Sequence, residues 1–441
     1  MARLRWLVIF TLLLALACSL IKAPRPQHIV PNYTPEIAQS EPLATQEQVF
    51  SMLSRGQAAE VLAAPPELLK DVAGARMRGA ALTMLGDYDA AEKALLEART
   101  MSSDANVSGQ ICEDLVWIAL AKYNYGQAAR WHAEQVTLCD IKANPLMHLW
   151  SRLAITGDST LTMPESPVVL PVTGRPFPRA QIKVNGKKTN FIFDTGAGMT
   201  AIKASLAKEL KLPVISLPDT AHGLGKIIVR YTIIDKIELG DAVFTNIPAV
   251  VIDDKDLTFT IMGIFKLIDI PGIIGMPMLA QMRVTLDMPA HKIILEKPGG
   301  KVDGAKTELV FWHSQLYVPV YLAEMGRLNF FVDTGANRSS LSFDSAKLIP
   351  STAKVDRGSR DLAQGAGGSM RMAGVYLPRW MALDGMRMEG LGLDLESRAR
   401  EHEDDLLNRD GTLGMDILQC YRVTFDIPSR FMSLELPPKK P

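Results

Sequence analysis

The chain has 441 residues, enough for two or three domains, and its 48 basic residues balance 48 acidic ones, so the formal net charge is zero. No basic block stands out, and we therefore expect no nucleic-acid partner. The seven histidines are scattered without a His-Glu-x-x-His pair. The acidic run at residues 401–405 lacks paired ligands at a metal-binding spacing, so we interpret it as a solvated loop and expect no metal or other cofactor.

The N-terminus has the parts of a secretory signal. Arg3 and Arg5 precede an apolar run at residues 6–16, and small residues follow it. The run is too short for a comfortable membrane span, so residues 1–17 are predicted to be a signal peptide. An uncleaved signal anchor is the alternative.

Cys18 ends this leader, at the place where bacterial lipoproteins, which the segment resembles, carry their lipidated cysteine. The resemblance implies an exported, periplasmic protein that is anchored to the membrane through Cys18. Ser19 would favour the outer membrane if the cell is Gram-negative. Ala15 replaces the leucine that is usual in lipoproteins, and Ala15 with Ala17 also fits ordinary secretory cleavage, which leaves no anchor.

The composition changes twice after the leader. Residues 18–44 are rich in proline and predict a flexible tether, whereas residues 45–156 are Ala-rich with helical spacing and predict an all-α domain. A Gly-containing turn followed by an Ala-Ala pair occurs at 85–91 and 123–129, and 53–59 is a looser match. These segments resemble degenerate tetratricopeptide repeats, which implies a concave face that holds a peptide or protein partner. A structural spacer is the alternative.

Two cysteines lie on successive predicted helices of this domain. Cys112 and Cys139 are 27 positions apart, and in an oxidising compartment they could form a disulfide. Two buried free thiols are the alternative. Cys420, near the C-terminus, is not predicted to be a nucleophile, because nothing places a histidine beside it.

The sequence Asp-Thr-Gly-Ala occurs twice, beginning at Asp194 and at Asp333, each time after an apolar run that predicts a strand. The two copies are 139 positions apart. Later landmarks keep this offset: Gly275 and Gly414, residues 285–289 and 424–428, and Asn190 and Asn329. A constant offset predicts a duplicated unit with halves at residues 165–298 and 305–438.

Two aspartates on such loops suit peptide hydrolysis. Carboxyl groups about 3 Å apart cannot both ionise, so they share one proton. The ionised group then takes a proton from water while the protonated group donates to the scissile carbonyl. We predict that Asp194 and Asp333 are the catalytic pair, and that Gly196 and Gly335 allow the tight turns. The alternative is that both copies are solvent-exposed turns. Two copies in register, each after an apolar strand, make that alternative less favourable.

With these motifs the C-terminal part of the chain, residues 168–437, resembles the retropepsin-like aspartic proteases. Each half of that family has an Asp-Thr-Gly loop and a later apolar-apolar-Gly signature, found here at residues 272–275 and 411–414. The resemblance implies an all-β acid-protease fold in which Thr195 and Thr334 cross-brace the loops by hydrogen bonds. After the first loop Gly-Met-Thr follows, and after the second Asn-Arg-Ser, which is more typical of the family.

Retropepsins also cover their cleft with glycine-containing hairpins, and each half has one candidate flap. Gly223 and Gly225 mark the first, and Gly365 and Gly367 mark the second. A plain surface hairpin is the alternative for both. A phosphate-binding loop at Gly223 is rejected, because the strand-loop-helix spacing and a following Gly-Lys-Ser/Thr are missing.

Local patterns predict the elements around each loop. Asn185-Gly186 indicates a hairpin turn. Strands are predicted at residues 180–184, 190–193, 316–322 and 328–332, and short helices at 201–210 and 342–348.

The sequence therefore predicts a multidomain protein, with an N-terminal all-α repeat domain and a C-terminal all-β acid-protease fold made of two halves. We interpret it as an exported aspartic endopeptidase whose helical domain recruits a protein substrate or partner. Pairing of the two halves within one chain is the simpler interpretation, and pairing between two chains stays open. A binding scaffold that no longer cuts, and a helical protein whose protease cuts only its own tether, are the rival hypotheses.

Overall fold

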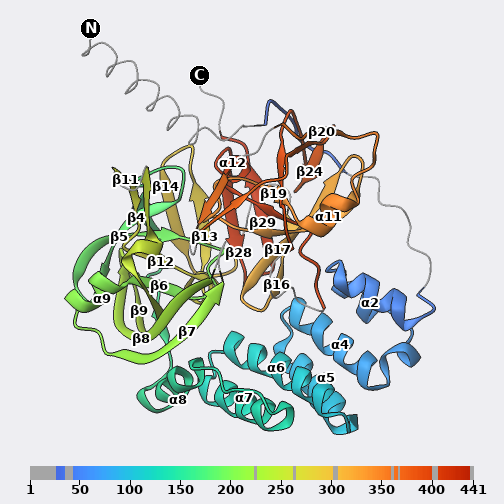
Figure 1. Cartoon of the computed structure of the whole chain (residues 1–441), viewed down its shortest axis with the longest axis horizontal. Coiled ribbons are helices and arrows are strands. Elements are labelled where there is room, and N and C mark those ends of the chain that lie inside the picture. The colour runs from blue at the N-terminus through green and yellow to red at the C-terminus, as the bar shows by residue number, and fades with distance from the viewer. Residues whose placement is uncertain are drawn as a thin grey trace.

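The computed structural model describes residues 26–34, 43–222, 226–261, 265–300, 306–358, 362–365, 368–399 and 406–437. The predicted signal peptide and Cys18 lie outside these ranges. Among the residues described, no helix is long and apolar enough to cross a membrane. A layer of helices lies along one side of a β body, in which two β halves stand side by side (Figure 1).

Helices form most of the chain between residues 46 and 156, and polar side chains fix where several of them begin. Thr45, Asp71, Asp87, Asp104 and Asn124 each accept a hydrogen bond from a backbone N–H in the first turn of the helix that follows. The elements are α2 (Gln46–Ser54), α3 (Ala58–Leu62), η1 (Pro66–Leu69), α4 (Val72–Met84), α5 (Tyr88–Met101), α6 (Ala105–Ala121), α7 (Tyr125–Cys139) and α8 (Leu146–Thr156). α4 packs against α5, and α6 packs against α7. That these pairs are tetratricopeptide repeats stays a prediction.

The two cysteines of the helical domain are free thiols, so the disulfide considered from the sequence is not formed. Cys112 of α6 is buried, and this burial raises its pKa to about 11. The Sγ of Cys139 instead lies beside Gly109 and 3.7 Å from the carbonyl oxygen of Ala105, so it contacts α6 before the position of Cys112.

Part of the predicted tether is ordered, which corrects that prediction for residues 26–34. β1 (His28–Val30) pairs antiparallel with β25 (Met386–Glu389) at the edge of a sheet in the second half. The backbone N–H of Tyr33 donates to the carbonyl of Gly385 at 2.7 Å. β1 forms because the edge of β25 offers unpaired backbone groups. The sequence of residues 26–34 alone does not reveal that edge.

The first β half is a sheet that closes on itself, because β8 pairs with β9 as well as with β4 and β7. Its strand order is β2-β9-β6-β12-β5-β4-β8-β7. The elements are β2 (Thr160–Thr162), β3 (Val168–Pro171), β4 (Arg179–Val184), β5 (Lys187–Phe193), β6 (Thr200–Lys203), α9 (Ala204–Glu209), β7 (Val214–His222), β8 (Lys226–Leu239), β9 (Ala242–Ile252), η2 (Asp254–Leu257), β10 (Thr258–Ile261), β11 (Phe265–Asp269), β12 (Gly272–Ile274), α10 (Met276–Leu279), β13 (Arg283–Asp287) and β14 (Lys292–Glu296).

Two local predictions for this half can be compared with the structure. The hairpin β4–β5 turns at Asn185 and Gly186, both with positive φ, as an Asn-Gly turn requires. The helix expected at 201–210 begins only at Ala204, because residues 200–203 pair with β9 as β6.

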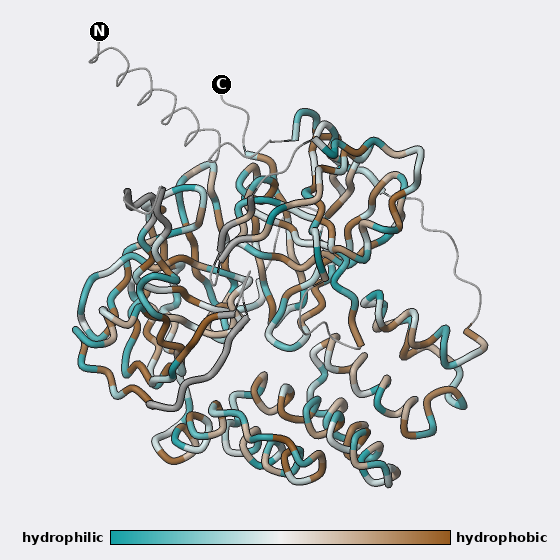
Figure 2. Tube along the Cα trace, in the orientation of Figure 1, coloured by the Kyte–Doolittle hydropathy of each residue, from teal (hydrophilic) through white to brown (hydrophobic). Residues whose placement is uncertain are grey.

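In the described part of the second half, an eleven-stranded sheet includes β1, and most of its strands are shorter than those of the first half. Its elements are β15 (Thr307–Glu308), β16 (Val310–Trp312), β17 (Gln315–Leu322), β18 (Gly326–Val332), β19 (Ser340–Leu341), α11 (Phe343–Lys347), β20 (Lys354–Asp356), β21 (Leu362–Gly365), β22 (Gly368–Arg371), β23 (Val375–Leu377), β24 (Met381–Leu383), β25, β26 (Leu393–Leu395), β27 (Gly411–Leu413), α12 (Met415–Leu418), β28 (Arg422–Asp426) and β29 (Phe431–Glu435). Hydrophobic stretches lie within the strands of both halves (Figure 2). One large cluster of buried apolar residues runs through both halves.

A six-stranded sheet joins the two halves, in the order β15-β29-β28-β13-β14-β3. At its centre Thr285 of β13 lies opposite Thr424 of β28, and their hydroxyl oxygens are 2.9 Å apart. These two residues are separated by the 139 positions that separate the Asp-Thr-Gly loops. The centre of the shared sheet therefore relates equivalent residues of the two halves.

Candidate functional site

Each Asp-Thr-Gly loop begins where a strand ends. Asp194 follows β5 and its N–H donates to the carbonyl of Ile274 at 3.0 Å; Asp333 follows β18 and its N–H donates to that of Leu413 at the same distance. The strands β5 and β12 are parallel, as are β18 and β27. The same arrangement of two parallel strands therefore positions each aspartate.

The late glycines pack directly against the loops. The N–H of Met276, after Gly275, donates to the carbonyl of Ala197 at 2.8 Å, and the N–H of Met415 makes the equivalent bond to Ala336. A Cβ on Gly275 or Gly414 would collide with loop backbone. These positions therefore need glycine because backbone approaches them closely.

Thr195 and Thr334 bind one another's loops. The N–H of Thr195 donates to Oγ1 of Thr334 at 3.0 Å, and the N–H of Thr334 donates to Oγ1 of Thr195 at 3.1 Å. Each hydroxyl then donates across to the other half, Thr195 to the carbonyl of Val332 and Thr334 to that of Phe193. Both threonines are buried, so these four bonds hold the two loops in a fixed relation.

The two carboxyl groups lie at the meeting point of the loops. Gly196 donates its N–H to Oδ1 of Asp194 at 2.8 Å, and Gly335 donates to Oδ1 of Asp333 at 2.9 Å. A Cβ on Gly196 would fall on the carboxyl group of Asp333, and one on Gly335 would fall on that of Asp194. Each aspartate therefore occupies the space beside the opposite glycine.

Both aspartates are half-buried. Burial, followed by the negative charge of Asp333, raises the pKa of Asp194 well above the usual range of an aspartate. Such a pair can hold one proton and one negative charge, which provides an acid and a base at the same place.

The residues that follow the two loops are held differently. Arg338 forms a bidentate pair with the buried carboxylate of Asp394, with distances of 2.6 and 2.5 Å. Next to it Ser339 donates both its hydroxyl and its N–H to Asp416, at 2.6 and 3.0 Å. Burial raises the pKa of Asp416 to about 6.

Position 199, which is equivalent to Arg338, is a methionine that packs against an apolar cluster shared with the helical domain. The sequence analysis missed Asp394 and Asp416. The repeat offset places Pro277 opposite Asp416, and this mismatch is the signal that could have drawn attention to Asp416.

The two candidate flaps fall on hairpins, β7–β8 and β21–β22. Gly223, Gly225 and Gly367 lie outside the described residues, and Gly365 ends β21. The predicted flaps can thus be located by their strands, and their role stays a prediction.

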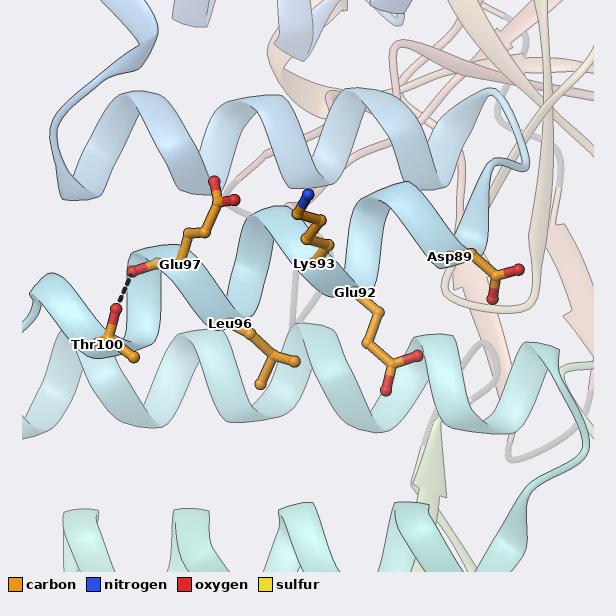
Figure 3. A pocket seen from close by; sticks show the side chains of 6 residues that line it. All are labelled: Asp89, Glu92, Lys93, Leu96, Glu97 and Thr100. Carbon is orange, nitrogen blue, oxygen red and sulfur yellow. Dashed lines mark hydrogen bonds between the residues drawn. The ribbon is translucent and has the colours of Figure 1, made fainter.

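No group of three or more His, Cys, Asp or Glu side chains that could hold a metal ion occurs in the described ranges. A shallow hollow of about 480 Å³ lies on α5, lined by Asp89, Glu92, Lys93, Leu96, Glu97 and Thr100 (Figure 3). Its acidic groups already have partners, since Lys122 binds Asp89 and Glu92, and Arg78 binds Glu97. We therefore do not assign a ligand to this hollow.

Two comparisons with known proteins found similarity. The aspartyl protease family model matches residues 180–278, which include the first loop and the first late glycine. A solved structure of a retropepsin-like aspartic protease from Rickettsia conorii is 17% identical, covers 31% of this chain and 91% of its own, and has a TM-score of 0.21. No curated protein sequence matches the chain.

Proposed function

We propose that this chain is an aspartic-type endopeptidase in which Asp194 and Asp333 activate a water molecule to hydrolyse peptide bonds. The observation that carries the proposal is the reciprocal geometry of the loops, in which each carboxyl group lies beside the glycine of the other half. The match of residues 180–278 to the aspartyl protease family supports the same reaction class.

The two carboxyl groups share one proton, and we propose that Asp194 carries it while Asp333 acts as the base. Asp333 takes a proton from water as the water oxygen bonds to the carbonyl carbon, and Asp194 gives its proton to the carbonyl oxygen. The tetrahedral intermediate collapses when the C–N bond breaks. The leaving amine receives the proton from Asp333, and one hydroxyl group of the intermediate returns a proton to Asp194 as the C=O bond of the product forms. No covalent bond to the enzyme forms.

Because Asp194 must be protonated, its pKa sets the alkaline limit of activity. A raised pKa keeps the proton at pH values where an ordinary aspartate has lost it, so the alkaline limb should lie above the ordinary carboxyl range.

The remaining parts of the proposal concern location and recruitment. We infer that the protein is exported and lipid-anchored at Cys18, and that the helical domain recruits a protein substrate or partner. In a membrane fractionation, Cys18→Ala should move the protein to the soluble fraction. If the variant stays membrane-bound, lipidation of Cys18 is not the anchor.

The first experiment is cleavage of a diverse peptide library from acidic to neutral pH by protein that lacks the leader, beside Asp194→Asn and Asp333→Asn. Cleavage that both substitutions abolish supports the proposal and gives the specificity. No cleavage by a folded wild type across this range would contradict it and favour a binding scaffold.

A further inference from the structure

The apolar cluster beside the first loop is built by both domains. The β half contributes Ile192, two residues before Asp194, and Met199, five residues after it. The helical domain contributes Val116 and Ala119 of α6, Tyr125 and Ala128 of α7, and Leu149, Trp150 and Leu153 of α8. The residues on both sides of the catalytic loop thus pack in one cluster with the helices.

The hairpin proposed to cover the substrate contributes to the same cluster. Ile227, Val229 and Tyr231 of β8 are buried in it, whereas Ile228 between them is 51% exposed. This alternation means that one face of β8 is covered. α8 packs against β8 and β9, and Figure 1 shows α8 beside the edge of the half that carries them.

A polar contact ties the helices to the other side of the loop. The hydroxyl of Tyr123, in the turn between α6 and α7, donates to the carbonyl of Pro277 at 2.9 Å. Pro277 lies in α10, directly after the late-glycine signature, at the position equivalent to Asp416. Where the second half fixes its loop through its own carboxylate, the first half contacts the helical domain.

We propose that helices α6–α8 position the first catalytic loop and the β7–β8 hairpin, so that the helical domain sets how tightly substrate binds. This inference rests on the proposed function for its kinetic consequence. Leu153 and Tyr123 are positioning residues, because they act through Met199, β8 and α10 and have no role in the reaction itself.

Two matched variants of the full chain test the proposal. Leu153→Ala opens a cavity in the cluster beside the first loop, and Leu95→Ala opens one in a cluster whose buried residues all belong to helices α4, α5 and α6; both leucines are fully buried. Because a displacement of about 1 Å can cost about 100-fold in rate, Leu153→Ala should lower kcat/KM about tenfold or more on a peptide substrate, mainly through KM. Leu95→Ala should change it less than about threefold. Equal effects of the two variants would overturn the proposal.

Two further variants separate positioning from loss of folding. Leu153→Met keeps the volume and should restore KM to near the wild-type value. Tyr123→Phe removes only the hydroxyl and should raise KM about threefold while the thermal midpoint stays close to that of wild type. If Leu153→Ala does not fold and Tyr123→Phe leaves KM unchanged, the proposal is wrong.

Amide hydrogen exchange gives a readout that does not require activity. Leu153→Ala should speed exchange at residues 192–199 and 227–233, and Leu95→Ala should not. If the wild type proves inactive and this difference is still found, the proposed function fails and the positioning role of the helices stands. If exchange is unchanged in an active Leu153→Ala variant, the positioning role fails and the proposed function stands.

Discussion

The two Asp-Thr-Gly loops have the same hydrogen bonds around their carboxyl groups and different supports behind them. Gly196 and Gly335 make matching bonds, and so do the backbone N–H groups of the two aspartates. After the loops, Arg338 is fixed by a buried ion pair, while position 199 is an apolar side chain in a cluster shared with the helices.

This difference separates the contacts that the two loops share from those that they do not. The carboxyl geometry depends on contacts between the halves, so it must match on both sides. The support lies within the second half at Arg338 and against the helices at Met199, so it differs between the loops. Both loops also have one support in common, because Phe331, two residues before Asp333, packs against the helical domain as Ile192 does.

The largest effect is expected where the loops are alike. Gly196→Ala and Gly335→Ala should each lower kcat about 1,000-fold, because the new methyl displaces the carboxyl group of the opposite aspartate. Gly198→Ala is the matched control, since a Cβ there meets nothing within 4 Å. Steady-state kinetics on one peptide substrate gives the kcat of each variant. Wild-type kcat in a variant at Gly196 or Gly335 would contradict the reciprocal geometry.

A second prediction concerns the support that differs. Arg338→Met gives the second loop the residue of the first and removes the guanidinium from the buried carboxylate of Asp394, which should cost about 3–5 kcal/mol in the free energy of unfolding. Met199→Ala, at the partly buried equivalent position, should cost about 1–2 kcal/mol.

Urea unfolding measures both of these changes. Arg379→Met is the control, because Arg379 is 77% exposed in its pair with Glu324, and its loss should cost less than about 1 kcal/mol. If Arg338→Met were as mild as this control, the ion pair would not be the support of the second loop.

The sequence predicted the part of the site that repeats. The constant offset predicted that the two Asp-Thr-Gly loops and the late glycines are equivalent, and the resemblance to retropepsins implied the bonds between Thr195 and Thr334. That these residues form a catalytic site stays a prediction. Asp394 lies 56 residues from Arg338 and has no repeat signal, so its ion pair could not be predicted.

The contacts with the helices were equally hidden. Trp150 and Met199 belong to one cluster only because the two domains pack together. The periodicity of either segment does not indicate which residues the other domain contributes. The strand at residues 28–30 was missed for the same reason, since it depends on the edge of β25.

A smaller effect should appear in the pH dependence of stability. Burial raises the pKa of Asp416 from 3.8 to about 6, so the folded protein binds this proton more tightly than the unfolded chain. The stabilising contribution is complete below the unfolded pKa and is lost as pH rises through the folded pKa, a change of up to about 3 kcal/mol.

In Asp416→Asn the fall in unfolding free energy between about pH 4 and pH 6.5 should therefore be smaller than in the wild type. Asp384, whose pKa burial also raises to about 6, should account for a further part, and the double variant should be the least pH-dependent. Urea unfolding across this range measures the slope. An unchanged slope in Asp416→Asn would show that its carboxyl group does not titrate in this way.

The single-chain pair of aspartates is tested most directly by mixing two inactive variants. Asp194→Asn and Asp333→Asn are assayed separately and then together, with the wild type diluted over the same concentration range. If both carboxyl groups act within one chain, each variant and the mixture should be inactive, and wild-type activity per molecule should not depend on concentration. Cleavage by either variant alone, or activity that returns on mixing, would contradict a catalytic pair formed by Asp194 and Asp333 of the same molecule.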